Sequence, residues 1–139
     1  MRAFTRSLAD APCFRISPDD TNYFAILADP IGDDVPWITV IEIFDRDGKT
    51  PPNSHAVAHE MFYVLKGEGI AIADGEKTPV KAGDALVLHP GCEHVVENTG
   101  EGKLYCLTTM IPDEEFAALI RNGKPETLLD EDLKALTSL

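Results

Sequence analysis

The chain has 139 residues, the size of one domain, and it carries a formal charge of −12 at pH 7. The acidity is spread evenly, because residues 1–50, 51–100 and 101–139 each carry a net charge of −4. This distribution excludes a nucleic-acid or anionic-membrane binder, since both need clustered cations. A hydrophobic content of 44% excludes a disordered chain, and apolar runs of about five residues are too short to span a membrane.

The first ten residues lack the apolar stretch of a secretory signal, and the three cysteines have no regular spacing. We therefore expect a cytoplasmic protein with reduced thiols. Cys13, Cys92 and Cys106 are interpreted as small buried apolar residues.

Short apolar stretches separated by Gly, Pro, Asn or Asp are typical of an all-β domain. Eight strands are expected, at residues 23–28, 37–44, 60–65, 70–73, 78–81, 85–88, 95–98 and 104–109. The stretch 70–73 is expected to pair with 60–65, and Asp74-Gly75 to form a hairpin turn. Eight short strands need closed edges, so the sequence predicts a closed barrel or a double-sheet roll. The residues expected to point inward are Phe62, Val64, Ile72, Leu86 or a neighbour, and Val96.

Toward the C-terminus the apolar spacing becomes that of a helix. Short helices are expected at 116–120, capped by Asp113, and at 130–136, capped by Asp130 with Leu133 and Leu136 facing inward. We therefore expect a β-barrel over residues 1–112 and a helical extension over 113–139. The extension is expected to cover the barrel or a dimer partner and to have no catalytic role.

Histidine placement indicates a metal site. The four histidines fall into two groups, His55 with His59 and His89 with His94. Asn53 and His55 share one face of an extended segment, because side chains alternate along a strand. Glu60 rejoins that face if residues 56–58 form a turn or bulge, and His94 comes from a separate strand. Two imidazoles and one carboxylate on an inner wall suit Fe, Mn, Ni or Zn and leave coordination positions open.

The spacing of these residues resembles the two motifs of the cupin superfamily over roughly residues 37–110. The first motif, G(X)5HXH(X)3,4E(X)6G, is matched by His55, Glu60 and Gly67, with Asn53 at the first histidine and Gly48 one position too close. The second, G(X)5PXG(X)2H(X)3N, is matched by Gly83, Gly91, His94 and Asn98, with His89 at the first proline. The 15 residues between Gly67 and Gly83 are similar to the short inter-motif region of small single-domain cupins.

The resemblance implies a double-stranded β-helix, or jelly-roll, barrel that holds one divalent transition metal. Its ligands would be His55, Glu60 and His94, with Asn53 at the remaining ligand position. Asn53 leaves three outcomes open: coordination through its amide oxygen, a hydrogen bond to a metal-bound water, or a weakened site. A purely structural role in the turn that follows two prolines has similar weight.

Three further residues lie close to the motifs. His59 is adjacent to Glu60 and would point to the opposite face, so its coordination requires a bulge. His89 is interpreted as a barrel-mouth or dimer-facing residue, with an acid–base role as the alternative. Cys92 precedes His94 in a turn and is interpreted as an inert thiol near the metal rim.

The arginine distribution limits the ligand. None of the five arginines lies within residues 51–100, although Arg15 and Arg46 remain able to reach the pocket mouth. Since anionic ligands usually need a guanidinium clamp, we expect a small, neutral or weakly acidic organic molecule rather than a sugar phosphate. All acidic residues except Glu60 are interpreted as surface groups.

The resemblance leaves two functions open. The chain is either a metal-dependent enzyme of dioxygenase, lyase or isomerase type, or a non-catalytic domain that binds or senses a small molecule. A homodimer is also implied, with the exposed faces of 37–44 and of Met61, Tyr63 and Leu65 as contact surfaces.

Overall fold

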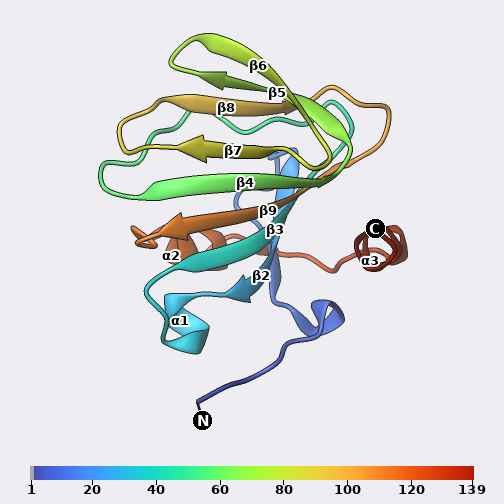
Figure 1. Cartoon of the computed structure of the whole chain (residues 1–139). Helices are drawn as coiled ribbons and strands as arrows, with labels where there is room; N and C mark the ends of the chain where they lie inside the picture. The colour runs from blue at the N-terminus through green and yellow to red at the C-terminus, as the bar shows by residue number, and fades with distance from the viewer. Residues whose placement is uncertain (1) are drawn as a thin grey trace.

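The computed structural model describes residues 2–139, which form two antiparallel sheets that face each other (Figure 1). The larger sheet has the strand order β10-β1-β2-β3-β9-β4-β7, and the smaller has the order β6-β5-β8. The strands are β1 (Cys13–Arg15), β2 (Asn22–Ala28), β3 (Ile38–Phe44), β4 (His59–Lys66), β5 (Glu68–Ala73), β6 (Glu76–Lys81), β7 (Ala85–Leu88), β8 (His94–Asn98), β9 (Leu104–Ile111) and β10 (Lys124–Pro125). The all-β jelly-roll barrel predicted from the sequence is confirmed.

Four short helical segments accompany the strands: η1 (Leu8–Asp10), α1 (Pro30–Asp33), α2 (Phe116–Arg121) and α3 (Asp130–Thr137). The two C-terminal helices were expected, whereas η1, α1, β1 and β10 were not, because each spans four residues or fewer. Within residues 2–139, no helix has the length and apolarity needed to cross a membrane.

One strand pairing differs from the expected one. β5 pairs with β6 and β8 in the smaller sheet, while β4 pairs with β7 and β9 in the larger one. Gly67 separates β4 from β5 and has a φ of 98°, a conformation that side chains other than glycine rarely adopt. The chain therefore leaves one sheet at this residue and enters the other. The expected hairpin turn at Asp74-Gly75 is present, with positive φ at both residues.

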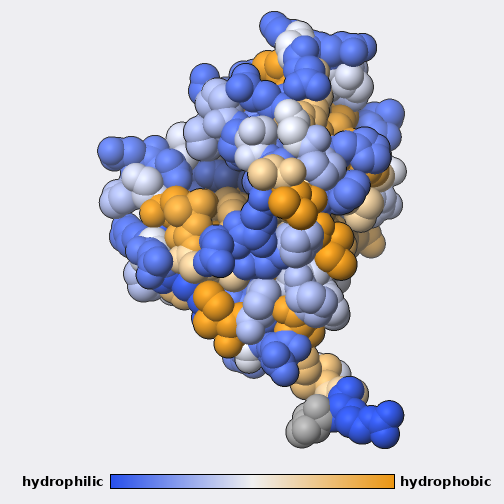
Figure 2. Space-filling view, turned by 90° about the vertical axis from the view of Figure 1, so that its left-hand side faces the viewer, coloured by the Kyte–Doolittle hydropathy of each residue, from blue (hydrophilic) through white to orange (hydrophobic). Residues whose placement is uncertain are grey.

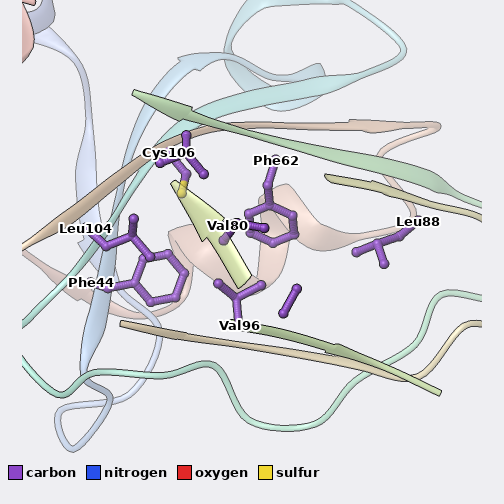
Figure 3. Close-up of a cluster of buried hydrophobic side chains, with 9 residues drawn as sticks. Phe44, Phe62, Val80, Leu88, Val96, Leu104 and Cys106 are labelled. Carbon is purple, nitrogen blue, oxygen red and sulfur yellow. The ribbon is translucent and has the colours of Figure 1, made fainter. Parts of the chain in front are cut away.

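The main apolar core lies between the two sheets (Figure 3). Along β4 every second residue is buried, so Glu60, Phe62 and Val64 face the interior, and Val96 on β8 faces them from the smaller sheet. Ile72 was expected to point inward, but its neighbour Ala71 is the buried residue. The expected phase of β5 was therefore wrong by one residue.

The outer face of the larger sheet is partly covered by the C-terminal segment. Ile41 and Ile43 on β3 are buried in a second cluster with Ala135 of α3, so the expected exposed dimer face on residues 37–44 is wrong. Asp132 anchors α3, because its carboxylate accepts hydrogen bonds from the hydroxyls of Tyr23 and Tyr105 at 2.7 and 2.8 Å.

The capping residue and the buried face of α3 differ from those expected. Asp132, rather than Asp130, accepts a hydrogen bond from the backbone at the start of α3, and it is fully buried with Ala135. Leu133 is only half-buried. Asp113 does bind the start of α2, since its side chain accepts from the Ala117 amide at 2.9 Å.

Asn98, the last residue of the second motif, closes the barrel at the end that lies away from His94. Its Nδ2 donates to the carbonyl oxygens of Phe44, Asp45 and Gly102, and its Oδ1 accepts from the Gly100 amide. The side chain is 5% exposed, so these carbonyl groups receive their donor where water has little access. An asparagine suits this position because its short amide side chain provides two donor hydrogens and an acceptor oxygen at once.

We expect Asn98→Ala to lower the free energy of unfolding by about 1–3 kcal/mol, because it leaves buried carbonyl groups without a donor. Asn98→Asp should cost more, since its carboxylate would face the same carbonyl oxygens. Urea unfolding measures both changes, with the exposed neighbour variant Thr99→Ala as the control. Equal stability of Asn98→Asp and the wild type would contradict this role.

Candidate metal centre

Three side chains from separate parts of the chain meet at one end of the barrel. Glu60 is the second residue of β4 in the larger sheet, and His94 begins β8 in the smaller sheet. His55 lies on the extended segment that runs along the free edge of β8. The structure therefore brings together His55, Glu60 and His94, as the sequence predicts.

Backbone hydrogen bonds fix the segment that carries His55. The Asn53 amide donates to the His94 carbonyl at 3.1 Å, and the His94 amide donates to the Asn53 carbonyl at 2.8 Å. The His55 carbonyl accepts from the Gly91 amide at 2.7 Å. The second motif thus holds the first one in place through the backbone.

The bend expected at residues 56–58 is present and returns Glu60 to the inner face. Glu114, which precedes α2, stabilises this bend, because its carboxylate accepts from the amides of Val57 and Ala58 at 3.0 and 3.1 Å. The C-terminal extension therefore helps to direct the Glu60 side chain toward the inner face of β4.

Two imidazoles converge on a single oxygen of Glu60. The Nε2 atoms of His55 and His94 lie 3.1 and 3.0 Å from Glu60 Oε1, and the ligand atoms of all three residues lie within 4.8 Å of one another. The Nδ1 of His94 lies 3.0 Å from the Cys92 carbonyl oxygen. Since a carbonyl oxygen can only accept a hydrogen bond, Nδ1 carries the hydrogen and donates it. This bond directs Nε2 toward the centre of the cluster.

These contacts set the charge of the cluster. Burial opposes ionisation of Glu60, but the hydrogen bonds from His55 and His94 outweigh it and hold the pKa of Glu60 below its ordinary value. Burial also opposes protonation of His94, yet its bonds to Glu60 and to the Cys92 carbonyl raise its pKa. The cluster therefore contains an ionised carboxylate that attracts positive charge.

The donor set fits a divalent transition metal. Ligand atoms at about 2.1 Å from one ion, on adjacent positions, are roughly 3 Å apart, which matches both contacts to Glu60. Two nitrogen donors and one carboxylate oxygen suit Fe, Mn, Ni or Zn. One cation at this point would replace the protons that the imidazoles share with the carboxylate.

A cavity of about 180 Å³ opens beside the cluster. Its lining residues are Ile16, Asp20, Asn22, Phe24, Glu42, Thr50, Pro51, Asn53, His55, Glu60, Phe62, His94, Phe116 and Leu119. This volume is below the roughly 300–1,000 Å³ of ordinary ligand pockets, so it suits a molecule of few non-hydrogen atoms. Figure 2 faces the side of the molecule on which α2 lies and shows hydrophobic side chains at the surface there.

The C-terminal extension contributes to this cavity. Phe116 and Leu119 of α2 form part of its wall, and the Phe116 ring centre is 6.5 Å from that of His55. The extension was expected only to cover the barrel or a dimer partner, but it also forms part of the cavity wall. The helix has no motif that marks it as part of a site, and only the packing of α2 against the barrel places it there.

The other residues that the sequence indicated lie at different places. Asn53 is exposed at the cavity mouth. His59 and His89 are both exposed and lie against each other, with ring centres 5.3 Å apart, outside the cluster. Cys92 is half-buried against the main core, where burial raises its thiol pKa. The bulge that would bring His59 to the metal site is not formed.

No arginine or lysine lines the cavity among the described residues. Arg15, which was expected to be able to reach the mouth, is bound instead to the Asp20 carbonyl, Asp45 and Glu126. The lining carries three carboxyl groups, those of Asp20, Glu42 and Glu60. The described lining therefore contains carboxyl groups but no lysine or arginine to pair with them.

Glu42 is the residue that sequence reasoning missed. It lies in β3 between Ile41 and Ile43, is 2% exposed and lines the cavity, so the interpretation of all acids except Glu60 as surface groups was wrong. Burial and the nearby Glu60 raise its pKa to about 8, although hydrogen bonds from Asn22 and Thr108 oppose the rise. A lone acid inside an otherwise apolar strand was the available signal.

We expect Glu42→Gln to flatten the pH dependence of the free energy of unfolding in the metal-free protein. The carboxyl pKa is about 8 in the folded protein and 4.5 in the unfolded chain. Its contribution to stability is therefore full below pH 4.5 and is lost as the pH rises through about 8, by up to about 1.4 kcal/mol per pH unit.

Urea unfolding in the presence of a metal chelator, repeated at several pH values from about 5 to 8, measures the pH dependence of the free energy of unfolding for both proteins. Glutamine keeps the side-chain volume, and the Thr108 hydroxyl can reverse its bond to accept from the new amide. The exposed Glu76→Gln is the matched control. Parallel stability curves for Glu42→Gln and the wild type would contradict the raised pKa.

Known proteins resemble this chain in sequence and in fold. The sequence profile of the cupin domain matches residues 40–110, which is half of the chain. The oxalate-binding protein of Thermotoga maritima is 38% identical over 69 residues, which are 45% of this chain and 57% of that protein. An uncharacterized protein of Methanocaldococcus jannaschii is 36% identical over 64 residues, which are 46% of this chain and 51% of that protein.

The chain thus spans about half the length of the curated relatives it matches. A crystal structure named as a predicted oxalate decarboxylase, from Thermotoga maritima, has a TM-score of 0.71 and covers 78% of this chain and 99% of that chain. Its sequence identity is 23%, so this likeness concerns the fold alone. The profile match over half of the length, together with the two motifs, shows that this chain belongs to the cupin family.

Proposed function

We propose that this protein binds one divalent transition metal through His55, Glu60 and His94 and presents it to a small organic ligand. The observation that carries the proposal is the convergence of both Nε2 atoms on Glu60 Oε1 beside a cavity. Three protein ligands leave open positions at which a ligand oxygen binds. A metal held in this way acts as a Lewis acid or activates oxygen.

Asn53 belongs to this proposal as the fourth group at the metal. Its backbone is bonded to His94, and its side chain lies at the mouth of the same cavity. An amide oxygen coordinates more weakly than an imidazole, so Asn53 acts either directly or through a bound water. A lower metal affinity in Asn53→Ala supports either role.

The ligand is a small neutral or weakly acidic molecule. The cavity volume of about 180 Å³ limits its size, and the absence of lysine and arginine from the described lining disfavours a multiply charged phosphate. A weak acid is held instead by the metal. The relative named as an oxalate-binding protein is in keeping with a ligand of this size and class.

The reaction type is dioxygenase, lyase or isomerase, each of which uses a metal with open positions. A non-catalytic binding or sensing role is the second candidate. It is favoured by the asparagine at the remaining ligand position and by the name of the oxalate-binding relative, which states binding only.

We expect the purified protein to contain about one transition metal ion per chain and His94→Ala to lower its affinity at least about tenfold. The matched control is His59→Ala, because His59 is an exposed histidine outside the cluster. Elemental analysis and titration with Co²⁺ measure both. Full metal content in His94→Ala, or equal losses in both variants, would exclude the proposed centre.

We also propose a homodimer, formed through the outer face of β4, β7 and β9. Met61, Tyr63, Val87 and Ile111 are exposed on this face, while Leu65 is half-buried. Met61 pairs with Val87 on neighbouring strands, so their side chains are adjacent. An exposed apolar face of this kind favours association with a second copy.

Light scattering is expected to give twice the chain mass of 15.2 kDa at micromolar concentration. Val87→Asp should reduce the mass to that of one chain, because it places a charge in the apolar face. Ile31→Asp, at an equally exposed apolar residue on α1, should leave the mass unchanged. A monomeric wild type would refute the dimer.

A further inference from the structure

Glu42 is a buried acid that neither the fold nor the proposed metal centre requires. It lies within β3 and its side chain enters the cavity beside the metal ligands. At this position an apolar residue would extend the buried surface of a strand whose residues from Val40 to Phe44 are otherwise apolar and buried. A carboxyl group in such a place lowers stability unless it has partners.

The partners of Glu42 hold it in one orientation. Asn22 Nδ2 donates to Oε2 at 3.0 Å, and Thr108 Oγ1 donates to Oε1 at 3.2 Å. These donors come from β2 and β9, the two strands that flank β3 in the sheet. Each oxygen is therefore tethered from a different side, and the group cannot rotate freely.

Acceptor capacity remains after these two bonds. A carboxylate offers about four acceptor positions, and the two donors use two of them. Among the described residues, no lysine or arginine lines the cavity to neutralise Glu42. The carboxyl group is therefore fixed in position and only partly satisfied, with the cavity as the remaining space.

We propose that Glu42 is the second recognition point of the ligand, where it accepts a hydrogen bond from a hydroxyl group while another oxygen of the same molecule binds the metal. The inference rests on the proposed metal centre and names the class of its ligand. That class is a short, bifunctional compound with a carboxylate or carbonyl oxygen at one end and a hydroxyl group at the other.

A hydroxyl group fits this position better than an ammonium group. Glu42 is 2% exposed, and its bonds to Asn22 and Thr108 leave acceptor positions toward the cavity that one O–H donor can fill without bringing a further charge into the interior. An ammonium group would bring a charge and three donors, each of which needs an acceptor in this buried place.

The test compares ligands that differ by one hydroxyl group. Three pairs are used with the Co²⁺-loaded protein: glycolate and acetate, 3-hydroxypropionate and propionate, and 4-hydroxybutyrate and butyrate. Calorimetry and the cobalt absorption spectrum give the dissociation constants. A hydrogen bond to Glu42 is expected to make one hydroxylated acid bind about five- to thirtyfold more tightly than its partner.

Variants separate Glu42 from the metal as the source of that preference. In Glu42→Leu, which has a similar volume and no acceptor, the preference should fall to within about twofold. A preference that arises from chelation of the metal by the hydroxyl oxygen would persist in this variant. Glu76→Gln, an exposed acid on β6, should retain the full preference.

Thermal unfolding and metal content of each variant are measured first. If Glu42→Leu does not fold, Glu42→Met, which is unbranched and lacks a strong acceptor, and Thr108→Val carry the test, and each should reduce the preference at least about threefold. An unchanged preference in these variants, or no preference in any pair, overturns the role of Glu42. Loss of metal binding in the wild type would instead refute the proposed centre itself.

Discussion

The contact between Glu60 and His94 is the constraint on which this end of the molecule depends. It joins the two sheets, because Glu60 belongs to β4 of the larger sheet and His94 to β8 of the smaller one. Both side chains are at most 4% exposed, and their atoms are 3.0 Å apart. Since a buried carboxylate without a partner is costly, the spacing of the sheets is fixed here by the need to keep this contact. The backbone of His94 also holds Asn53, and thereby the segment that carries His55.

The two ends of the barrel have different tasks. Away from His55, Glu60 and His94, the space between the sheets is filled by Phe44, Leu104 and Cys106, and Asn98 joins the strand ends. Apolar packing of this kind stabilises the fold without any help from the site. The other end can therefore carry polar groups that lower stability, and α2 limits its opening rather than filling it.

The acidic composition has different consequences on the surface and inside. Most of the 24 acidic residues contribute charge at the surface, but two buried carboxyl groups lie at the cavity, and their pKa values are shifted in opposite directions. Hydrogen bonds from two imidazoles keep Glu60 ionised, whereas Glu42 lacks a cationic partner among the described residues and burial favours its proton. Neighbouring carboxyl groups whose pKa values are moved apart can take different roles in one site.

The sequence by itself determined the barrel, the eight main strands and the grouping of His55, Glu60 and His94, because strand alternation and motif spacing are local properties of the chain. The sequence could not reveal that β5 joins the smaller sheet, that Ala71 rather than Ile72 points inward, or that α2 forms a cavity wall. These features depend on which distant segments pack together. The tertiary structure alone also decided the character of Glu42, since its burial and its bonds to Asn22 and Thr108 come from residues 20 and 66 positions away. An acid in a strand becomes part of a site only when its neighbours in space exclude water from it.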